Sequence, residues 1–287
     1  LERLHQERRQ KWEEAELAKY EAKGKKPPKG WEKQFPVHEN PTPEQLEPFP
    51  SLPQGWTYDL LENICDPSRP ICYGVIKLGN DFPNGVPCLR TSNVRPLRID
   101  IDAVKTISPK ISQNYERTVL QGGEVLVNVR GTLGGIAVVP ISMKGWNISR
   151  EVAMAAVSPH IFSEYIALAI ASYYSQNWLT GVLKGVAYTG INIADLKRLP
   201  VPIPPLDEQK EIVRDFYSRF RRVTGVFRSM KESHRDLETL TQSLLAKAFR
   251  GELVPQDPND EPASELLARI REEREKKAPA KKAKKAK

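Results

Sequence analysis

The sequence predicts an α+β protein, in which one globular domain with a mixed β-sheet and helices is followed by a long C-terminal coiled-coil helix. Two short runs rich in β-branched residues, 124–129 and 136–139, have the length of strands and predict the sheet. Apolar residues that recur every seven positions between 213 and 248 predict the coiled coil. A proline-rich segment, 199–206, separates the two regions.

The composition is that of a globular protein. The chain has 287 residues, 28% charged and 39% apolar, enough for one large domain with extensions or two modest domains. It has no apolar run of about 18 residues, which argues against a membrane span. The charged N-terminus argues against a signal peptide, and the missing start methionine suggests a fragment, a processed form or an engineered product. Cys65, Cys72 and Cys88 are an odd count, which favours reduced thiols in a cytoplasmic protein.

Two segments precede the globular domain. Residues 1–33 predict a helical segment and a linker, because strong helix formers fill the first 23 positions and Gly24 then breaks the helix. The helix has few apolar side chains, so it needs a partner for stability. Residues 34–50 are rich in proline and predict an extended connector.

The globular domain is expected over residues 51–206. The strands at 124–129 and 136–139 are joined by a glycine-rich hairpin loop. Residues 152–157 predict a third strand, although their alanines weaken the pattern.

One buried helix and one connector complete the domain. Ser158 as N-cap and Pro159 in the first turn predict a helix that runs to about Leu179 and is apolar on most of its surface. The prolines of 199–206 predict a rigid, extended connector that ends the domain.

The clearest pattern is the heptad repeat of a helix over 207–250, with Asp207 as the expected N-cap and Gly251 after its end. About 40 residues make a rod roughly 60 Å long. An exposed seam of this length requires a partner helix, and the polar His234 and Thr241 within it are expected to set register or orientation. The helix-pairing seam consists of Val213, Phe216, Phe220, Val223, Phe227, Met230, His234, Leu237, Thr241, Leu244 and Ala248.

The net charge of +8 is concentrated at the C-terminus. Residues 251–275 predict a turn and a short acidic helix, and residues 276–287 a disordered lysine-rich tail. The tail alone carries +7, whereas residues 51–207 carry only +2. The total charge is therefore weak support for nucleic-acid binding by the folded part.

Familiar catalytic patterns are missing from the sequence. It contains no Walker loop, no Asn-Pro-Pro-Tyr of amino-methyltransferases and no nucleophile elbow, and Glu124 with Arg130 makes no convincing metal-nuclease pair. We expect no catalytic residue, no metal site and no cofactor in this chain. The histidines, expected to be ordinary surface or seam residues without zinc-ligand spacing, are His5, His38, His160 and His234.

Four loop clusters carry side chains suited to DNA. Arginine matches guanine edges and phosphates, asparagine matches adenine, and serine and threonine serve either. For any single residue a solvated loop side chain is an equally good interpretation, but at least two clusters are expected to form one face. The predicted DNA-binding residues are Arg90, Thr91, Ser92, Asn93, Arg95 and Arg98, then Arg130 and Thr132, then Lys144 and Arg150, and finally Lys184, Tyr188, Thr189 and Asn192.

Three segments resemble the specificity (S) subunits of type I restriction–modification systems. Residues 52–56, Leu-Pro-Gln-Gly-Trp, are similar to the motif that opens a target recognition domain in that family. Residues 190–209, which include Leu199-Pro200-Val201-Pro202-Ile203-Pro204-Pro205 and Glu208-Gln209, resemble the signature that leads into its spacer helix. Residues 248–254, Ala-Phe-Arg-Gly-Glu-Leu-Val, resemble the end of that helix. The likeness covers about residues 51–270.

The resemblance implies a target recognition domain at 51–206 that reads one half of a bipartite site on double-stranded DNA. It also implies a spacer helix at 207–250 that docks DNA methyltransferase (M) subunits, with the restriction (R) subunit joining through the complex. S-adenosylmethionine, ATP and Mg²⁺ would belong to those partner subunits. A full S subunit has two recognition domains and two antiparallel spacer helices, so this chain, whose residues 1–33 resemble the end of a central spacer, corresponds to a C-terminal half. Two copies, or this chain and an N-terminal half-subunit, would pair through the spacer helix.

The sequence thus leads to the hypothesis of a non-catalytic, sequence-specific DNA-recognition subunit. Two alternatives stay open. A stand-alone nuclease would cleave DNA with a metal ion, and a coiled-coil adaptor would bind its protein partners without residues 51–206.

Overall fold

The computed structural model describes residues 2–35, 39–181, 190–255 and 257–277. The chain divides into two compact units, Leu1–Arg219 and Phe220–Lys287. The first unit contains the globular domain.

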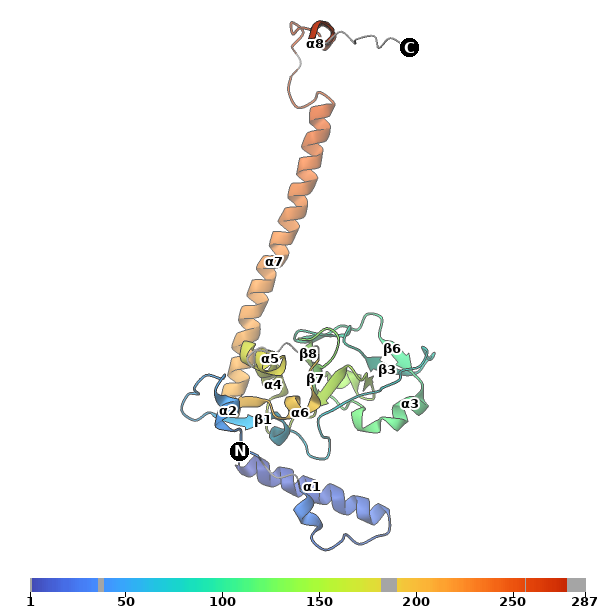
Figure 1. The fold of residues 1–287 in the computed structure, drawn as a ribbon, viewed down its shortest axis with the longest axis vertical. Coiled ribbons are helices and arrows are strands. Elements are labelled where there is room, and N and C mark those ends of the chain that lie inside the picture. Colours follow the sequence, from blue (N-terminus) through green and yellow to red (C-terminus); the bar gives the residue numbers. More distant parts are fainter. Residues whose placement is uncertain (1, 36–38, 182–189, 256, 278–287) are drawn as a thin grey trace, which may run out of the picture. The chain divides into compact units, whose positions relative to one another are not determined.

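Short strands in several small sheets form the β part of the globular domain, and helices pack on them (Figure 1). The strands are β1 (Thr57–Leu60), β2 (Cys72–Tyr73), β3 (Val86–Leu89), β4 (Val94–Arg95), β5 (Arg98–Ile99), β6 (Lys105–Ile107), β7 (Val125–Asn128), β8 (Ile136–Val138), β9 (Asn147–Ile148), β10 (Val152–Ala155) and β11 (Pro200–Ile203). The largest sheet is antiparallel, in the order β2-β10-β7-β8. A sheet in the order β6-β3-β9 is mixed, because β9 runs parallel to β3. This architecture confirms the α+β class and all three predicted strands.

The helices confirm the helical segments predicted at both ends of the chain and correct several predictions between them. They are α1 (Glu2–Ala22), α2 (Pro43–Leu46), α3 (Pro109–Asn114), α4 (Ser163–Ala171), α5 (Tyr173–Leu179), α6 (Ile193–Lys197), α7 (Leu206–Phe249) and α8 (Ala263–Lys277). In the residues described, no helix is long and apolar enough to cross a membrane.

The core forms on both faces of β7. Val125 and Val127 belong to the cluster that includes α4 and α5, whereas Leu126 faces a second cluster with Leu120 and Met154. Alternate residues of a strand point to opposite faces, so a strand that is covered on both sides reads as a continuous apolar run. This burial explains why the strand pattern was clear in the sequence.

The segment 199–206 is more than an extended connector. Its residues 200–203 form β11, which pairs antiparallel with β1 from Thr57 opposite Ile203 to Leu60 opposite Pro200. Proline is tolerated because each strand of this two-stranded sheet keeps one unpaired edge. The pairing joins the beginning and the end of the globular domain.

The single helix predicted from Ser158 to Leu179 is wrong. Residues 158–161 form a turn, and α4 begins after Phe162, whose backbone N–H donates to Gln209 Oε1 at 2.9 Å. Ser172 then interrupts the helix in an extended conformation, and its hydroxyl accepts from the Ser175 N–H as the N-cap of α5. A serine competes with the helix by such a bond, which the apolar pattern around it concealed.

Two smaller predictions about caps and connectors are also corrected. α7 begins at Leu206, so Asp207 lies in its first turn, where its carboxylate faces the helix dipole and pairs with Lys210 at 3.6 Å. In the connector 34–50, Thr42 caps α2 through a full capping box with Gln45, so this part is helical rather than extended.

The N-terminal helix α1 finds its partner in the domain itself. Leu4 is buried in the main core, His5 Nε2 lies 2.9 Å from Asp59 Oδ2, and Arg8 Nε donates to the Cys65 carbonyl at 3.3 Å. His160 Nε2 pairs with a carboxylate oxygen of Glu7. His5 on α1 and His160 on the globular domain therefore help to dock α1 and are not ordinary surface histidines. His38 lies outside the described residues.

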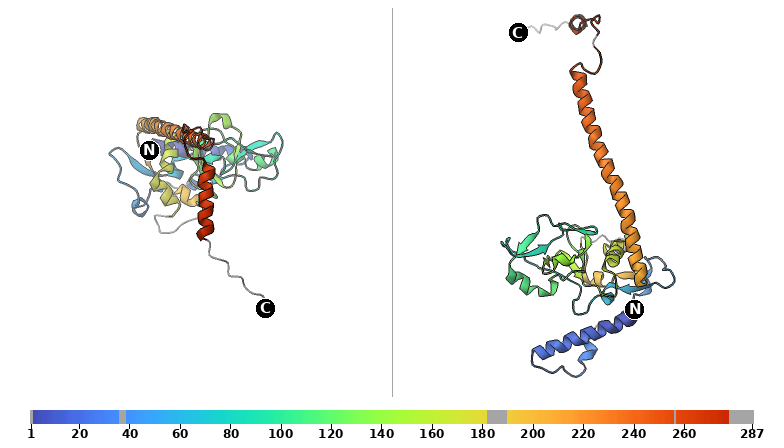
Figure 2. Two further views of the ribbon diagram at one scale, coloured as in Figure 1. Left: turned by 90° about the horizontal axis from the view of Figure 1, so that it is seen from above. Right: turned by 180° about the vertical axis from the view of Figure 1, so that it is seen from behind.

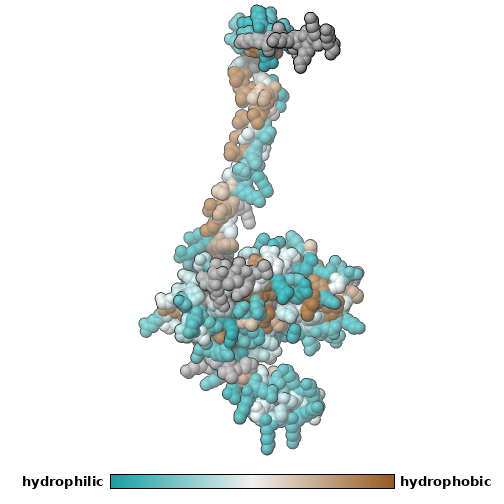
Figure 3. All heavy atoms as spheres, viewed as in Figure 1, coloured by the Kyte–Doolittle hydropathy of each residue, from teal (hydrophilic) through white to brown (hydrophobic). Residues whose placement is uncertain are grey.

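α7 is one continuous helix (Figure 2). Its apolar residues are buried near its start and exposed further along. Val213 is buried in the domain core and Phe216 is half-buried, so these two members of the seam are partly or wholly covered within the chain. Further along, apolar side chains lie exposed on the helix surface (Figure 3). His234 is also exposed, with Nε2 3.5 Å from Glu238 Oε1.

Candidate nucleic-acid interface

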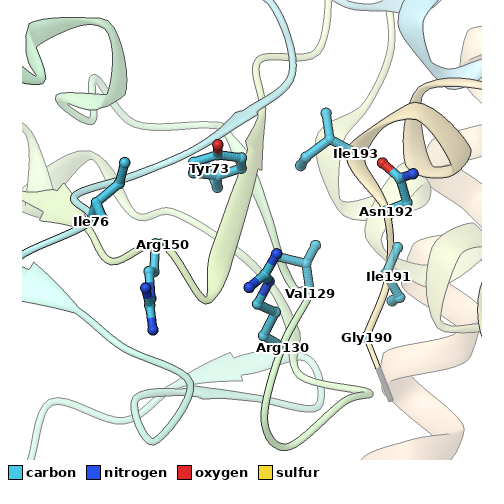
Figure 4. A pocket seen from close by; sticks show the side chains of 9 residues that line it. All are labelled: Tyr73, Ile76, Val129, Arg130, Arg150, Gly190, Ile191, Asn192 and Ile193. Carbon is cyan, nitrogen blue, oxygen red and sulfur yellow. The ribbon is translucent and has the colours of Figure 1, made fainter. Parts of the chain in front are cut away.

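A pocket of about 730 Å³ brings together residues from three of the predicted DNA-binding clusters. Arg130, Arg150 and Asn192 line it, together with Tyr73, which the sequence did not single out. Figure 4 shows the side chains of Arg130 and Arg150 in the same open space, with Tyr73 and Asn192 at its borders. Cationic forks beside an aromatic ring are suited to phosphates and bases.

Arg130 is positioned by a close approach of two backbone segments. The chain leaves β7 through the buried Val129, whose carbonyl accepts from the Ile191 N–H at 2.7 Å, and Arg130 forms a β-bridge with Gly190. A Cβ atom on Gly190 would lie 3.0 Å from the Val129 carbonyl oxygen, so the glycine permits this approach. Gly131 then turns the chain with a φ of 72°, which favours glycine. Arg130 is left exposed at the mouth of the pocket.

Arg150 stands on the turn between β9 and β10. Its backbone N–H donates to the Val75 carbonyl at 2.9 Å, which fixes the turn. Its side chain is half exposed, and its Nε lies 3.5 Å from Glu151 Oε1. Glu151 is itself held by a 2.7 Å hydrogen bond from Ser149 Oγ. The guanidinium is thus steered by one carboxylate but stays open to a ligand.

Asn192 is the N-cap residue of α6. Its Oδ1 accepts from the Ala194 N–H at 3.0 Å and starts α6. The residue is exposed, so its amide nitrogen remains the group that is suited to donate to a ligand.

The hairpin of β4 and β5 presents two arginines side by side. Arg95 and Arg98 are directly opposite in its register, and both are exposed. Like charges in this arrangement repel, unless an anion lies between them. Leu97 makes the turn with a φ of 56°, and its N–H donates to the Ile136 carbonyl at 2.7 Å, which holds the hairpin against β8. The hairpin therefore places two exposed cationic side chains next to each other.

Asn93, one of the predicted DNA-binding residues, is buried within its own loop. Asn93 is only 1% exposed; its Oδ1 accepts from the Arg90 N–H, and its Nδ2 donates to the carbonyls of Asp100 and Asp102. Its polar atoms are used inside the loop. Arg90 is half-buried, and its Nη2 donates to the Ala103 carbonyl at 3.2 Å, which turns part of its guanidinium inward.

The remaining predicted residues divide between this surface and other places. Ser92 and Thr132 are exposed, and Thr91 lies beside Gly131, where a Cβ atom would come within 3.8 Å of Thr91 Oγ1. Lys144 follows the far end of β8, away from the loop that carries Arg130. The predictions for Lys184, Tyr188 and Thr189 lie outside the described residues.

The polar groups that could suggest catalysis have structural roles. Glu124 is buried, accepts from the backbone N–H groups of Gln121 and Gly122, and pairs with Arg69 Nη1 at 2.8 Å. Burial raises the pKa of the Cys65 and Cys88 thiols to about 12, which disfavours the reactive thiolate. Among the side chains described, no group of three or more His, Cys, Asp or Glu is arranged to hold a metal ion.

The chain thus combines a globular α+β domain that exposes arginines with a long helix that exposes apolar side chains. Residues 75–223 match the model of the family described as Type I restriction modification DNA specificity domain. This match covers more than half of the chain, which therefore belongs to this family.

Similar proteins come from the same class. The type I restriction enzyme EcoBI specificity subunit of Escherichia coli is 32% identical over 234 residues, covering 78% of this chain and 49% of that protein. The EcoKI specificity subunit of Escherichia coli K12 is 29% identical over 215 residues, covering 70% and 46%. The chain thus spans about half the length of the curated relatives that it matches.

Solved structures share the fold. A structure described as showing complex assembly and conformational transition of the type I R-M system matches 88% of this chain and 56% of its own, with a TM-score of 0.54 and 24% identity. The HsdS subunit from Thermoanaerobacter tengcongensis matches 72% of this chain and 48% of its own, with a TM-score of 0.50 and 25% identity.

Proposed function

We propose that this chain is the sequence-specific DNA-recognition subunit of a type I restriction–modification complex in the cytoplasm. It reads one half of a bipartite DNA site with its globular domain and positions methyltransferase and restriction subunits. S-adenosylmethionine, ATP and Mg²⁺ are used by those partners. The observation that carries the proposal is the convergence of Arg130, Arg150 and Asn192 on one pocket.

The charge distribution agrees with recognition by a few well-placed side chains rather than by a large net charge. The region 51–207 carries only +2, yet the pocket and the β4–β5 hairpin together expose four arginines. Phosphate contacts from some of these side chains would fix the register on the duplex, and base contacts from others would select the sequence.

The test is selection from duplex DNA that carries a randomised segment, using the full chain alone and together with a type I methyltransferase subunit. Enrichment of a defined sequence supports the proposal. Binding without any sequence preference in both arrangements contradicts it, metal-dependent cleavage by the chain alone would indicate a nuclease, and partner binding that survives removal of residues 51–206 without DNA recognition would indicate an adaptor.

The exposed part of α7 supports a second role, that of a pairing helix. The apolar seam from Phe220 onward is exposed, and a coiled-coil seam is stable only when another helix covers it. We propose that a second copy or an N-terminal half-subunit provides this helix. Sedimentation equilibrium of the chain across concentrations tests it: a dimer supports the second copy, and a monomer that pairs only with an N-terminal half-subunit supports the other partner.

A further inference from the structure

Asn128, at the end of β7, is a buried polar residue in the middle of the predicted DNA-binding surface. It is 1% exposed, and its Nδ2 is shared among the carbonyl oxygens of Thr91, Val94 and Thr132 at 3.3, 3.1 and 3.0 Å. The carbonyls of Thr91 and Val94 belong to the loop 90–95, and that of Thr132 belongs to the glycine-rich loop 130–135. One side chain therefore connects two loops. The bonded residues of the first lie 34 and 37 positions from Asn128 in sequence, and that of the second lies 4 positions away.

The surroundings of Asn128 are built for this contact. A Cβ atom on Gly135 would lie 2.2 Å from Asn128 Nδ2 and 2.3 Å from the Val94 carbonyl oxygen, so only glycine allows the loops to come so close. The Asn128 backbone N–H donates to the Gly135 carbonyl at 2.8 Å, which closes the glycine-rich loop at its base. The Asn128 Oδ1 is buried without a hydrogen-bond partner in the residues described. The NH₂ group of the amide therefore makes all the side-chain contacts, although burial of its oxygen without a partner is unfavourable.

The tied loops carry the exposed arginines. Arg95 stands one residue after Val94, and Arg130 stands two residues before Thr132. The β4–β5 hairpin is joined to β8 by the Leu97 N–H bond to the Ile136 carbonyl, by the Pro96–Ile136 bridge and by packing of β4 and β5 on β8. These fix the hairpin to the sheet, whereas Asn128 fixes the two loops to each other.

We propose that Asn128 is a positioning residue for DNA recognition, which clamps the loops 90–95 and 130–135 into one rigid surface with a fixed spacing between Arg95 and Arg130. The inference rests on the proposed function. Base readout depends on geometry within a few tenths of an ångström, whereas attraction to phosphates depends mainly on charge. Loss of the clamp should therefore reduce discrimination between sequences more than it reduces binding to DNA in general.

The experiment compares Asn128→Ala and Asn128→Ser in the full chain with Asn147→Ala as a matched control. Asn147 is likewise fully buried, but its amide donates to Ser112 Oγ and the Tyr115 carbonyl, which belong to neither loop. The serine keeps one donor of the clamp and also serves if the alanine variant fails to fold. The probes are the duplex selected by the wild-type chain and a scrambled duplex of equal length, measured well below each thermal midpoint.

Asn128→Ala should lower the ratio of selected to scrambled affinity about tenfold, the scale of one base contact, with scrambled affinity changed less than about twofold. Asn128→Ser should lie between, and Asn147→Ala should keep the wild-type ratio despite a lower thermal midpoint. Equal ratios for all variants, or an equal loss in the Asn147 control, would overturn the inference. If the wild-type chain itself shows no preference, the proposed function fails before the clamp is tested.

Discussion

The two units of this chain treat the same kinds of side chain in opposite ways. In the first, apolar residues such as Leu126 and Ile166 are fully buried, and even the largely polar helix α1 docks on the domain through Leu4. In the second, Phe227, Met230 and Leu237 are each more than 60% exposed. The first unit completes its own core, whereas the second presents a surface that burial by another helix would stabilise. A closed core and an exposed apolar seam are therefore found in different units of one chain.

The largest expected effect concerns the buried ion pair of the first unit. Glu124→Ala removes the only carboxylate paired with Arg69 in the described structure and the acceptor of two backbone N–H groups, and should lower the free energy of unfolding by about 3–5 kcal/mol. Urea denaturation measures this. The double variant Arg69→Met with Glu124→Gln should recover part of the loss; a single variant as stable as wild type would show that the pair has no structural role.

The next prediction tests the contrast between the units directly. Leu126→Ala removes a side chain that is 0% exposed and should lower the free energy of unfolding by about 2–5 kcal/mol. Leu237→Ala removes one that is 61% exposed and should change the unfolding of the dilute chain by less than about 0.5 kcal/mol. At concentrations where chains associate, only Leu237→Ala should weaken association. Equal destabilisation at high dilution would contradict the contrast.

A smaller effect is expected at the arginine surface. Arg130→Ala should weaken binding to the selected duplex by about 1–3 kcal/mol if it contacts a base, without a change in the unfolding transition. Lys110→Ala removes the same charge on α3, which carries none of the predicted DNA-binding residues, and is the control. A larger loss with the lysine variant would place the interface elsewhere.

The smallest effect concerns thiol chemistry and pH. Burial holds the pKa of Cys65 and Cys88 near 12, so almost no thiolate exists at pH 8, and the folded chain should react with Ellman's reagent at these sites at least about tenfold more slowly than the unfolded chain. Their reactivity rises only as the pH approaches 12. Rapid labelling of Cys65 in the folded chain at pH 8 would show that the core is open.

Sequence patterns predicted those parts of the fold that local chemistry decides. The apolar run of β7 and the heptads of α7 are visible in short windows because each is set by periodicity. The prolines of β11 suggest a mere connector in the sequence, because its partner β1 lies far away along the chain. Ser172 was missed because a cap depends on a single hydroxyl inside an apolar run.

Residue type predicts the candidate site, and burial in the fold decides which of its side chains are accessible. Arg130, Arg150 and Asn192 line one pocket, but nothing local distinguishes the buried Asn93 from the exposed Ser92 beside it. Asn128 could have been noticed, since an amide at the end of a strand buried on both faces must find acceptors. Tyr73 carried no signal, because it reaches the pocket from a strand of two residues.

The most direct test of the central claim is the ratio of dissociation constants of the full chain for the selected and the scrambled duplex at physiological salt. A ratio of at least about ten, which falls toward one in the double variant Arg130→Ala with Arg150→Ala while the unfolding transition stays unchanged, is the result expected of a sequence-specific recognition surface at this pocket. Equal dissociation constants for the two duplexes, or a ratio that the double variant leaves intact, would contradict it.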